Sequence, residues 1–179
     1  IRLLVLLLYL TEYPFQGGNH SGWWIPEDNV YVLADETHGS PLKVIDTSDM
    51  TDLQVVSTLS SGVDSQSIPH NLMVRDGLVF VSYYHDGLQV FDVSDPSSPN
   101  LVAWYDTFIE SSHAGFAGAW GVHSALPSGK ILITDITNGL FVLELETEQI
   151  EVCPTDPIEW NGMSIDDGGY YSTEVTDDA

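Results

Sequence analysis

The chain has 179 residues, with 27 Asp and Glu against 4 Lys and Arg, which gives a formal net charge of -23. This charge excludes nucleic acid as a partner and argues against an anionic membrane surface, because both kinds of binding need Lys and Arg. Hydrophobic residues make up 43% of the chain, so we expect a packed core rather than disorder. The acidic composition instead favours affinity for cations.

An apolar run, IRLLVLLLYL, opens the chain at residues 1–10. It is too short to cross a bilayer as a helix, so the sequence predicts no membrane span. We interpret the run as a buried β-strand, with a remnant of a signal or anchor as the alternative. Residues 1–21 are therefore assigned to an N-terminal apolar strand and loop.

An internal repeat is the strongest signal in the remaining chain. GLVFVSYYHDGLQVFD (77–92) aligns without a gap with GKILITDITNGLFVLE (129–144), at an offset of 129 − 77 = 52 residues. Each copy predicts a strand, a tight turn and a strand, because the Asp-Gly and Asn-Gly pairs supply the positive φ that such turns need. A looser third copy has its strands at 30–33 and 42–46, and further strand-like segments lie at 22–25, 68–74 and 119–126.

Four short strands in each unit of roughly 45–50 residues are typical of a β-propeller. The sequence therefore predicts an all-β fold, a β-propeller of four-stranded blades with about three blades present at residues 22–153. Propellers have about four to eight blades, so we expect an incomplete one. A β-sandwich is the alternative, but it would not require the match between the two long repeats. Residues 154–179 are predicted to be an acidic tail or the start of a further blade.

Imidazole and carboxylate side chains are predicted to gather on one face of this propeller. The loops between second and third strands share that face with the entry to each first strand. Imidazole with carboxylate suits zinc, iron, manganese or copper, whereas a carboxylate-dominated set suits calcium. The alternative is that these residues order turns and strand starts. The candidate ligand-binding residues are Asp35, Glu36, His38, His70, His85 and Asp86, and the candidate metal ligands are Asp35, His70, His85 and Asp135.

Paired carboxylates on the opposite face offer a second cation site. Asp46 and Asp49 lie three residues apart, as do Asp92 and Asp95. They lack the glycine and the terminal glutamate of an EF-hand loop, and ordering of the loop by Asx-turns is the preferred interpretation. The sequence identifies no cofactor with certainty, and Ca²⁺ is the cation that it favours.

Other side chains with chemical potential are expected to be structural. Nucleophile and phosphate-binding motifs are missing, so the sequence favours a binding protein over an enzyme without deciding the question. Cys153 is expected to be an inert thiol and His123 a core histidine, while Asn19-His20-Ser21 matches a glycosylation pattern only. Packing within and between blades is the expected role of Trp23, Trp24, Trp104, Trp120 and Trp160.

Several segments resemble the LVIVD-repeat propellers, and in particular the choice-of-anchor B group of surface proteins. These segments are PHN (69–71), GLQVFDVSDPSSPNLV (87–102), GAWGVHSALPSGKILITD (118–135) and GLFVLEL (139–145), and the similarity extends over residues 28–146. The resemblance implies an exported, cell-surface or extracellular propeller. The chain differs from the family in showing no recognisable C-terminal anchoring segment and only about three blades, which suggests a fragment or a processed chain.

We therefore expect an extracellular or cell-surface propeller with a non-enzymatic binding or assembly function, stabilised by calcium. The alternatives are a metal-dependent hydrolase or lyase that uses the His/Asp cluster, and a carbohydrate-binding module. The expected partners are the remainder of the propeller, neighbouring copies or another surface protein.

Overall fold

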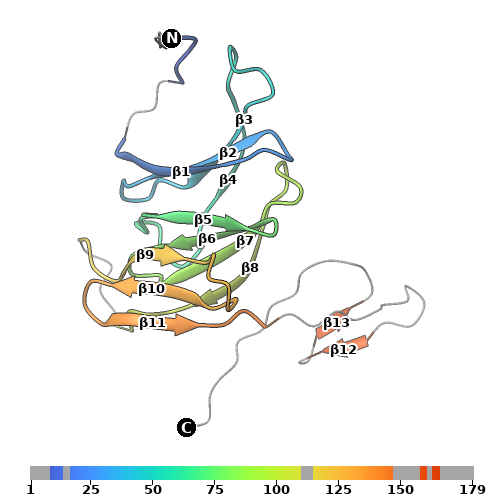
Figure 1. Cartoon of the computed structure of the whole chain (residues 1–179). Helices are drawn as coiled ribbons and strands as arrows, with labels where there is room; N and C mark the ends of the chain where they lie inside the picture. The colour runs from blue at the N-terminus through green and yellow to red at the C-terminus, as the bar shows by residue number, and fades with distance from the viewer. Residues whose placement is uncertain (1–8, 14–16, 110–114, 147–157, 161–162, 166–179) are drawn as a thin grey trace, which may run out of the picture.

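The computed structural model describes residues 9–13, 17–109 and 115–146, together with two short strands at 158–160 and 163–165. Within these residues all regular elements are β-strands (Figure 1). In this part of the chain there is no helix long and apolar enough to cross a membrane.

Three antiparallel sheets follow one another along the chain, and we call them blades 1, 2 and 3. Blade 1 contains β1 (Asn19–Ile25), β2 (Val30–Asp35), β3 (Leu42–Asp46) and β4 (Gln54–Leu59). Blade 2 contains β5 (Leu72–Arg75), β6 (Leu78–Ser82), β7 (Leu88–Asp92) and β8 (Asn100–Tyr105). Blade 3 contains β9 (Ala119–His123), β10 (Ile131–Asp135) and β11 (Gly139–Leu143), and a separate hairpin pairs β12 (Ile158–Trp160) with β13 (Met163–Ile165).

The blades are stacked through their first strands, as Figure 1 shows. β5 of blade 2 lies against β1 of blade 1 and against β9 of blade 3. Each blade runs up and down in sequence order, and the described sheets do not close into a ring. The prediction of an all-β, incomplete propeller is confirmed.

The β6–β7 turn shows why the repeats carry glycine. Gly87 has a φ of 71°, in the left-handed region that side chains disfavour. A Cβ atom at this position would lie 2.1 Å from the carbonyl oxygen of Tyr105 on the neighbouring strand. Glycine is therefore required both for the turn and for the close approach of β8.

Blade 2 is buried on both faces because its strands alternate between two hydrophobic cores. Val79, Val81 and Phe91 pack against blade 1. Phe80 and Val90 lie on the other face and pack against blade 3. This alternation explains why all five residues of β6 are buried.

Hydrogen bonds between side chain and backbone join blade 1 to blade 2 and blade 2 to blade 3. The Ser21 hydroxyl in β1 donates to the carbonyl oxygen of His70 at 2.8 Å. In the same direction, the Ser82 hydroxyl of blade 2 donates to the carbonyl oxygen of Trp120 in β9 at 2.9 Å. We call these two bonds the inter-blade hydroxyl bonds.

The limits of the predicted segments differ from those in the structure. β1 begins at Asn19, so blade 1 reaches into the segment assigned to 1–21. Residues 1–8 and Cys153 lie outside the described residues, while Tyr9 and Leu10 are exposed. The hairpin of β12 and β13 falls within 154–179.

Candidate functional site

One end of the blades brings together the turns after the second strands and the starts of the first strands. The N–H of Glu36, just after β2, donates to the carbonyl oxygen of Gly18, just before β1, at 2.7 Å. Tyr84, after β6, exchanges two backbone hydrogen bonds with Ala119 at the start of β9. We call this end the loop face. It is built from the same kinds of loop and strand start that the sequence predicted to share one face.

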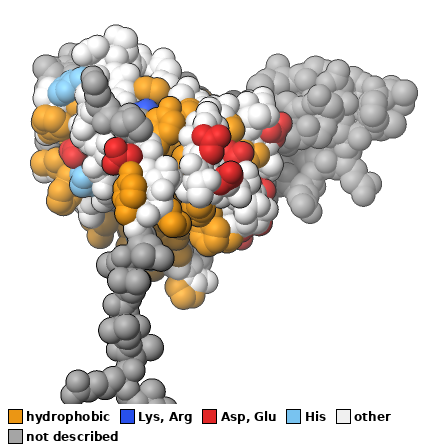
Figure 2. Space-filling view, turned by 90° about the horizontal axis from the view of Figure 1, so that it is seen from above, with side chains coloured by type: hydrophobic (Ala, Val, Ile, Leu, Met, Phe, Trp, Pro, Cys, Tyr) orange, Lys and Arg blue, Asp and Glu red, His pale blue; other side chains and the backbone are white. Residues whose placement is uncertain are grey.

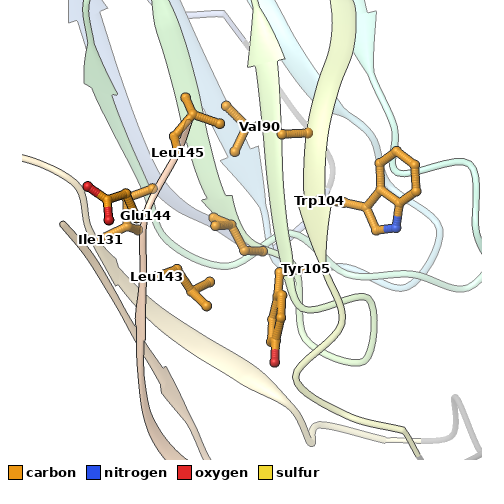
Figure 3. Close-up of a pocket in the computed structure, with 9 residues that line it drawn as sticks. Val90, Trp104, Tyr105, Ile131, Leu143, Glu144 and Leu145 are labelled. Atoms are coloured by element: carbon orange, nitrogen blue, oxygen red, sulfur yellow. The ribbon is translucent and has the colours of Figure 1, made fainter. Parts of the chain in front are cut away.

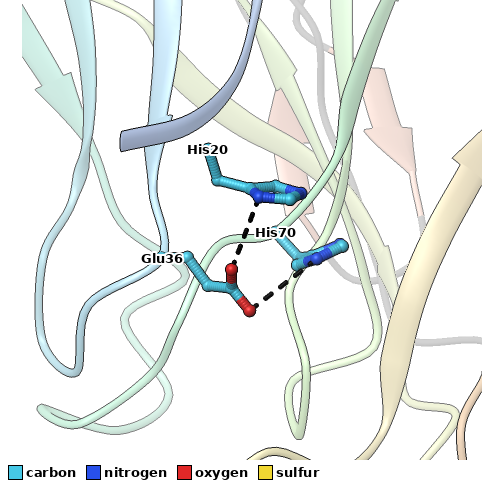
Figure 4. Close-up of side chains that lie close together, drawn as sticks. All are labelled: His20, Glu36 and His70. Atoms are coloured by element: carbon cyan, nitrogen blue, oxygen red, sulfur yellow. Dashed lines mark ion pairs between the residues drawn. The ribbon is translucent and has the colours of Figure 1, made fainter. Parts of the chain in front are cut away.

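Two histidines and one glutamate meet on the loop face, between blades 1 and 2 (Figure 4). His20 comes from β1, Glu36 follows β2, and His70 precedes β5. His20 Nδ1 lies 3.5 Å from one carboxylate oxygen of Glu36, and His70 Nε2 lies 3.7 Å from the other. The two imidazole rings lie 4.1 Å apart between centroids, tilted by 30°. We call these residues the His/Glu cluster.

His70 is the fixed member of the cluster. Its ring is buried, and its Nδ1 lies 2.5 Å from the carbonyl oxygen of Trp120. Since a carbonyl can only accept, Nδ1 carries the proton and Nε2 presents its lone pair toward Glu36. The indole of Trp120 also stacks on the ring, at 5.1 Å between centroids. Burial lowers the pKa of His70, and its bond to Trp120 opposes this only in part, so the neutral form is favoured.

Tyr84 holds the carboxylate of the cluster. Its hydroxyl donates to an oxygen of Glu36, and its ring meets that of His70 edge-on, 5.4 Å away. Burial, followed by the hydrogen bond to Glu36, raises the pKa of Tyr84. The hydroxyl therefore remains a proton donor to Glu36 at neutral pH.

Asp35 is the immediate neighbour of Glu36 but belongs to a different network. Its buried carboxylate accepts hydrogen bonds from the Gly18 N–H at 2.9 Å, the Thr37 hydroxyl at 2.6 Å and Lys43 Nζ at 3.3 Å. Burial would raise the pKa of Asp35, but the bonds from Thr37 and Lys43 outweigh it and lower the pKa. Asp35 therefore acts as the ionised partner of Lys43 inside blade 1.

Asp86 and Asp135 fasten the linkers between blades. The Ser61 hydroxyl, in the linker into blade 2, donates to Asp86 at 2.5 Å. The Thr107 hydroxyl, in the linker into blade 3, donates to Asp135 at 2.7 Å. In both blades a linker hydroxyl is thus bound by a carboxylate at the blade's own turn, a pattern that the sequence analysis did not identify.

The two remaining candidate ligand-binding residues, His38 and His85, each contact an aromatic ring. The buried ring of His85 meets Phe108 edge-on, and the exposed ring of His38 meets Phe116 in the same way. Of the predicted site residues, the structure brings Glu36 and His70 together and places Asp35, His85 and Asp135 in other networks. Within the residues that the structure describes, the His/Glu cluster is the one group of three or more potential metal ligands, with its ligand atoms within 4.8 Å of one another.

His20 was missed in the sequence, although the repeat contained the signal. Gly22, Leu72 and Val122 pair with equivalent positions of the second strands. The residues two positions before Gly22, Leu72 and Val122 are His20, His70 and Trp120. They are spaced by 70 − 20 = 50 and 120 − 70 = 50 residues, so the three occupy equivalent positions in the three blades. The first strand was predicted to begin only at residue 22, which left His20 outside the alignment.

The expectation that His123 is a core residue is wrong, because its side chain is exposed. Successive side chains of a strand point to opposite faces. Val122 faces the core shared with blade 2, so His123 points to the other side, where no described blade covers it.

The tryptophans are also less buried than expected. The side chains described for them are between 38% and 50% exposed, namely those of Trp23, Trp24, Trp104 and Trp120. Trp104 and Tyr105 border an apolar hollow of about 110 Å³ between blades 2 and 3 (Figure 3). Packing within and between blades therefore covers only part of each of these four rings, as where Trp120 stacks on His70.

The paired carboxylates on the opposite face bind their own loops. Asp46 and Asp49 accept N–H bonds at 2.8 Å from Ser48 and Thr51, and Asp49 also accepts a bond from the Thr51 hydroxyl at 2.6 Å. The Ser48 N–H lowers the pKa of Asp46, and the Thr51 hydroxyl, followed by the Thr51 N–H, lowers the pKa of Asp49. Asp92 and Asp95 make the same kind of bond at 2.9 and 3.0 Å. These contacts support the interpretation of Asx-turns. The surface seen in Figure 2 shows acidic side chains with very little Lys or Arg near them.

Comparison with known proteins finds one match, to the model of a repeat. No curated protein and no solved structure matches the chain. The family model of the LVIVD repeat matches residues 69–107, which include His70 and all four strands of blade 2. The chain therefore carries an LVIVD repeat, a repeat associated with β-propeller-like folds, and this repeat forms its second blade.

Proposed function

We propose that this chain is an extracellular or cell-surface β-propeller with a non-enzymatic binding and assembly function. One observation carries the assembly function. Leu88 and Val90 of blade 2, which pack toward blade 3, are 4% and 1% exposed, whereas the residues 52 positions later, Leu140 and Val142, are 61% and 62% exposed. Blade 3 therefore presents, uncovered, the same side chains that blade 2 uses to bind blade 3.

The partner that fits this open face is another blade of the same construction. Burying a leucine or a valine is worth about 1.5–3 kcal/mol each, so covering Leu140 and Val142 gives a substantial driving force. A contiguous exposed apolar surface is also typical of a site of interaction. The blade is supplied either by a continuation of the chain or by a neighbouring copy.

Two other observations support the proposed location of the protein outside the cell or on its surface. The resemblance to surface propellers implies export, and a net charge of -23 keeps copies soluble outside the cell while attracting cations. Calcium is the cation proposed to stabilise the acidic loops.

The assembly function is tested by placing a charge on the open face. The parent chain, Val142→Arg and a control, Val56→Arg on the exposed outer strand of blade 1, are compared by size-exclusion chromatography with light scattering and by thermal melting. If a neighbouring copy covers the open face, only Val142→Arg should dissociate the oligomer. If a continuation of the chain covers it in a natural polypeptide longer than 19.7 kDa, only Val142→Arg should lower the melting temperature of that polypeptide. A Val142→Arg protein that matches both the parent and the control in mass and melting would contradict the proposal.

A metal-dependent hydrolase or lyase is the second candidate. The His/Glu cluster favours it, because neutral imidazole and carboxylate are the groups that bind a catalytic metal ion. Its test is the loss of turnover after removal of metal.

A further inference from the structure

We propose that His20, Glu36 and His70 bind one divalent transition-metal ion of the zinc type, on the loop face between blades 1 and 2. The assembly function does not depend on this site, whereas the second candidate function does. The site was not contained in the sequence predictions, which combined His70 with Asp35, His85 and Asp135.

The spacing of the cluster suits such an ion. Metal–nitrogen and metal–oxygen bonds of about 2.0–2.1 Å place neighbouring ligands of a tetrahedral ion roughly 3.3–3.4 Å apart. The pairs of ligand atoms between each histidine and Glu36 are 3.5 and 3.7 Å apart. These two distances end on different oxygens of Glu36, and one ligand atom from each of the three residues lies within 4.8 Å of the other two, so rotation of the side chains brings the carboxylate and both imidazoles to a shared ion.

His70 has the hydrogen bonding of a metal-binding histidine. Histidine ligands commonly donate their second ring nitrogen to a carbonyl or carboxylate, which fixes the ring and directs the other nitrogen at the metal. The bond from His70 Nδ1 to Trp120 has this form and leaves Nε2 as the ligand atom. Burial also favours the neutral imidazole, which is the form that binds metal.

Glu36 and His20 complete the set from blade 1. The Tyr84 hydroxyl orients the Glu36 carboxylate, as an outer hydrogen bond to a metal ligand does. The side chain of His20 is 38% exposed, so its ring can turn until its plane meets that of His70 at the ion. Its exposed side leaves a fourth position for water or for a ligand.

The donor set also distinguishes this site from a calcium site. Calcium takes six to eight oxygen ligands, whereas two imidazoles and one carboxylate suit zinc, cobalt, nickel, copper or iron. An ion pair of Glu36 with the histidines, without metal, is the alternative, and it predicts no saturable binding of Zn²⁺ or Co²⁺. Zinc and cobalt should therefore bind and calcium should not compete.

The test uses Zn²⁺ and Co²⁺ with the metal-free chain. Isothermal titration calorimetry with Zn²⁺ and the visible absorption of Co²⁺ should both show about one ion per chain, unaffected by excess Ca²⁺. Loss of an outer hydrogen bond costs about 10–100-fold in metal affinity, so His20→Ala and Glu36→Gln, which remove ligands, should weaken binding at least tenfold. His20 is exposed, so its replacement should leave the far-ultraviolet circular dichroism and the melting temperature of the metal-free chain unchanged.

His123→Ala is the matched control, because His123 is also an exposed histidine of a first strand. It should bind Zn²⁺ like the parent chain. The proposal is overturned by the absence of saturable binding, by unchanged binding in His20→Ala, by equal loss in His123→Ala, or by displacement of Zn²⁺ by Ca²⁺.

Discussion

Arg75 joins blade 2 to blade 3, and its removal gives the sharpest test of how the blades are held together. It ends β5, and its Nη1 donates to the carbonyl oxygens of Ser124 at 2.6 Å and Gly129 at 3.0 Å. Both carbonyls belong to the connection between β9 and β10. The guanidinium carbon also lies 4.9 Å from the centroid of the Phe80 ring.

The expected cost of Arg75→Ala follows from these contacts. A hydrogen bond from a charged donor is worth about 1.5–3 kcal/mol, and a partly exposed cation–π contact about 0.5–1 kcal/mol. The two bonds share one nitrogen, the side chain is 23% exposed, and its release restores about 1.5–2 kcal/mol of rotamer entropy. We therefore expect the free energy of unfolding to fall by about 2–3 kcal/mol.

Urea unfolding followed by circular dichroism measures this loss. Lys130→Ala is the control, because the exposed ion pair of Lys130 with Glu144 is worth about 0–1 kcal/mol. Arg75→Met should lose less free energy of unfolding than Arg75→Ala and more than Lys130→Ala, since it keeps an apolar stem beside Phe80. Hydrogen exchange should show the lost protection first in the β9–β10 connection. An Arg75→Ala chain within about 0.5 kcal/mol of the parent would refute the reasoning, because that is the range of ordinary surface substitutions.

Two further predictions concern protons and calcium. Burial lowers the pKa of His70 below its ordinary 6.5, so the unfolded chain binds more protons and the stability present above pH 6.5 is lost as the pH falls toward the folded pKa. The urea midpoint should therefore drop between about pH 7.5 and 5.5, and less in His70→Asn; equal drops would contradict this assignment. Removal of calcium with EGTA should lower the melting temperature, by about 2–4 °C for each kcal/mol of stabilisation. An unchanged melt would remove calcium from the proposed function.

The blades could be predicted because their signals are local. Asp-Gly and Asn-Gly turns between apolar runs define a strand pair without knowledge of its neighbours. The ungapped match of 77–92 with 129–144 then gave the order of the strands, and the structure has β6, β7, β10 and β11 in these segments.

The cluster was harder to predict because its members come from two blades. Asp35 and Glu36 are adjacent and chemically alike, yet consecutive side chains at a strand end point in different directions. Asp35 turns to Lys43 within its own blade, whereas Glu36 turns to His70 of the next. Sequence patterns do not show which neighbour each one meets, and the exposed ring of His20 carried no signal of burial.

The inter-blade hydroxyl bonds give the stack of blades a direction. Ser21 and Ser82 each donate toward the C-terminal blade and never back, so the two ends of the stack are chemically different. A neighbouring copy that reproduces this joint between blades therefore joins head to tail. Such a contact repeats until the rotations add up to a closed ring, and otherwise it grows into an open filament. The curvature from one blade to the next thus decides whether assembly through this joint ends at a fixed number of copies.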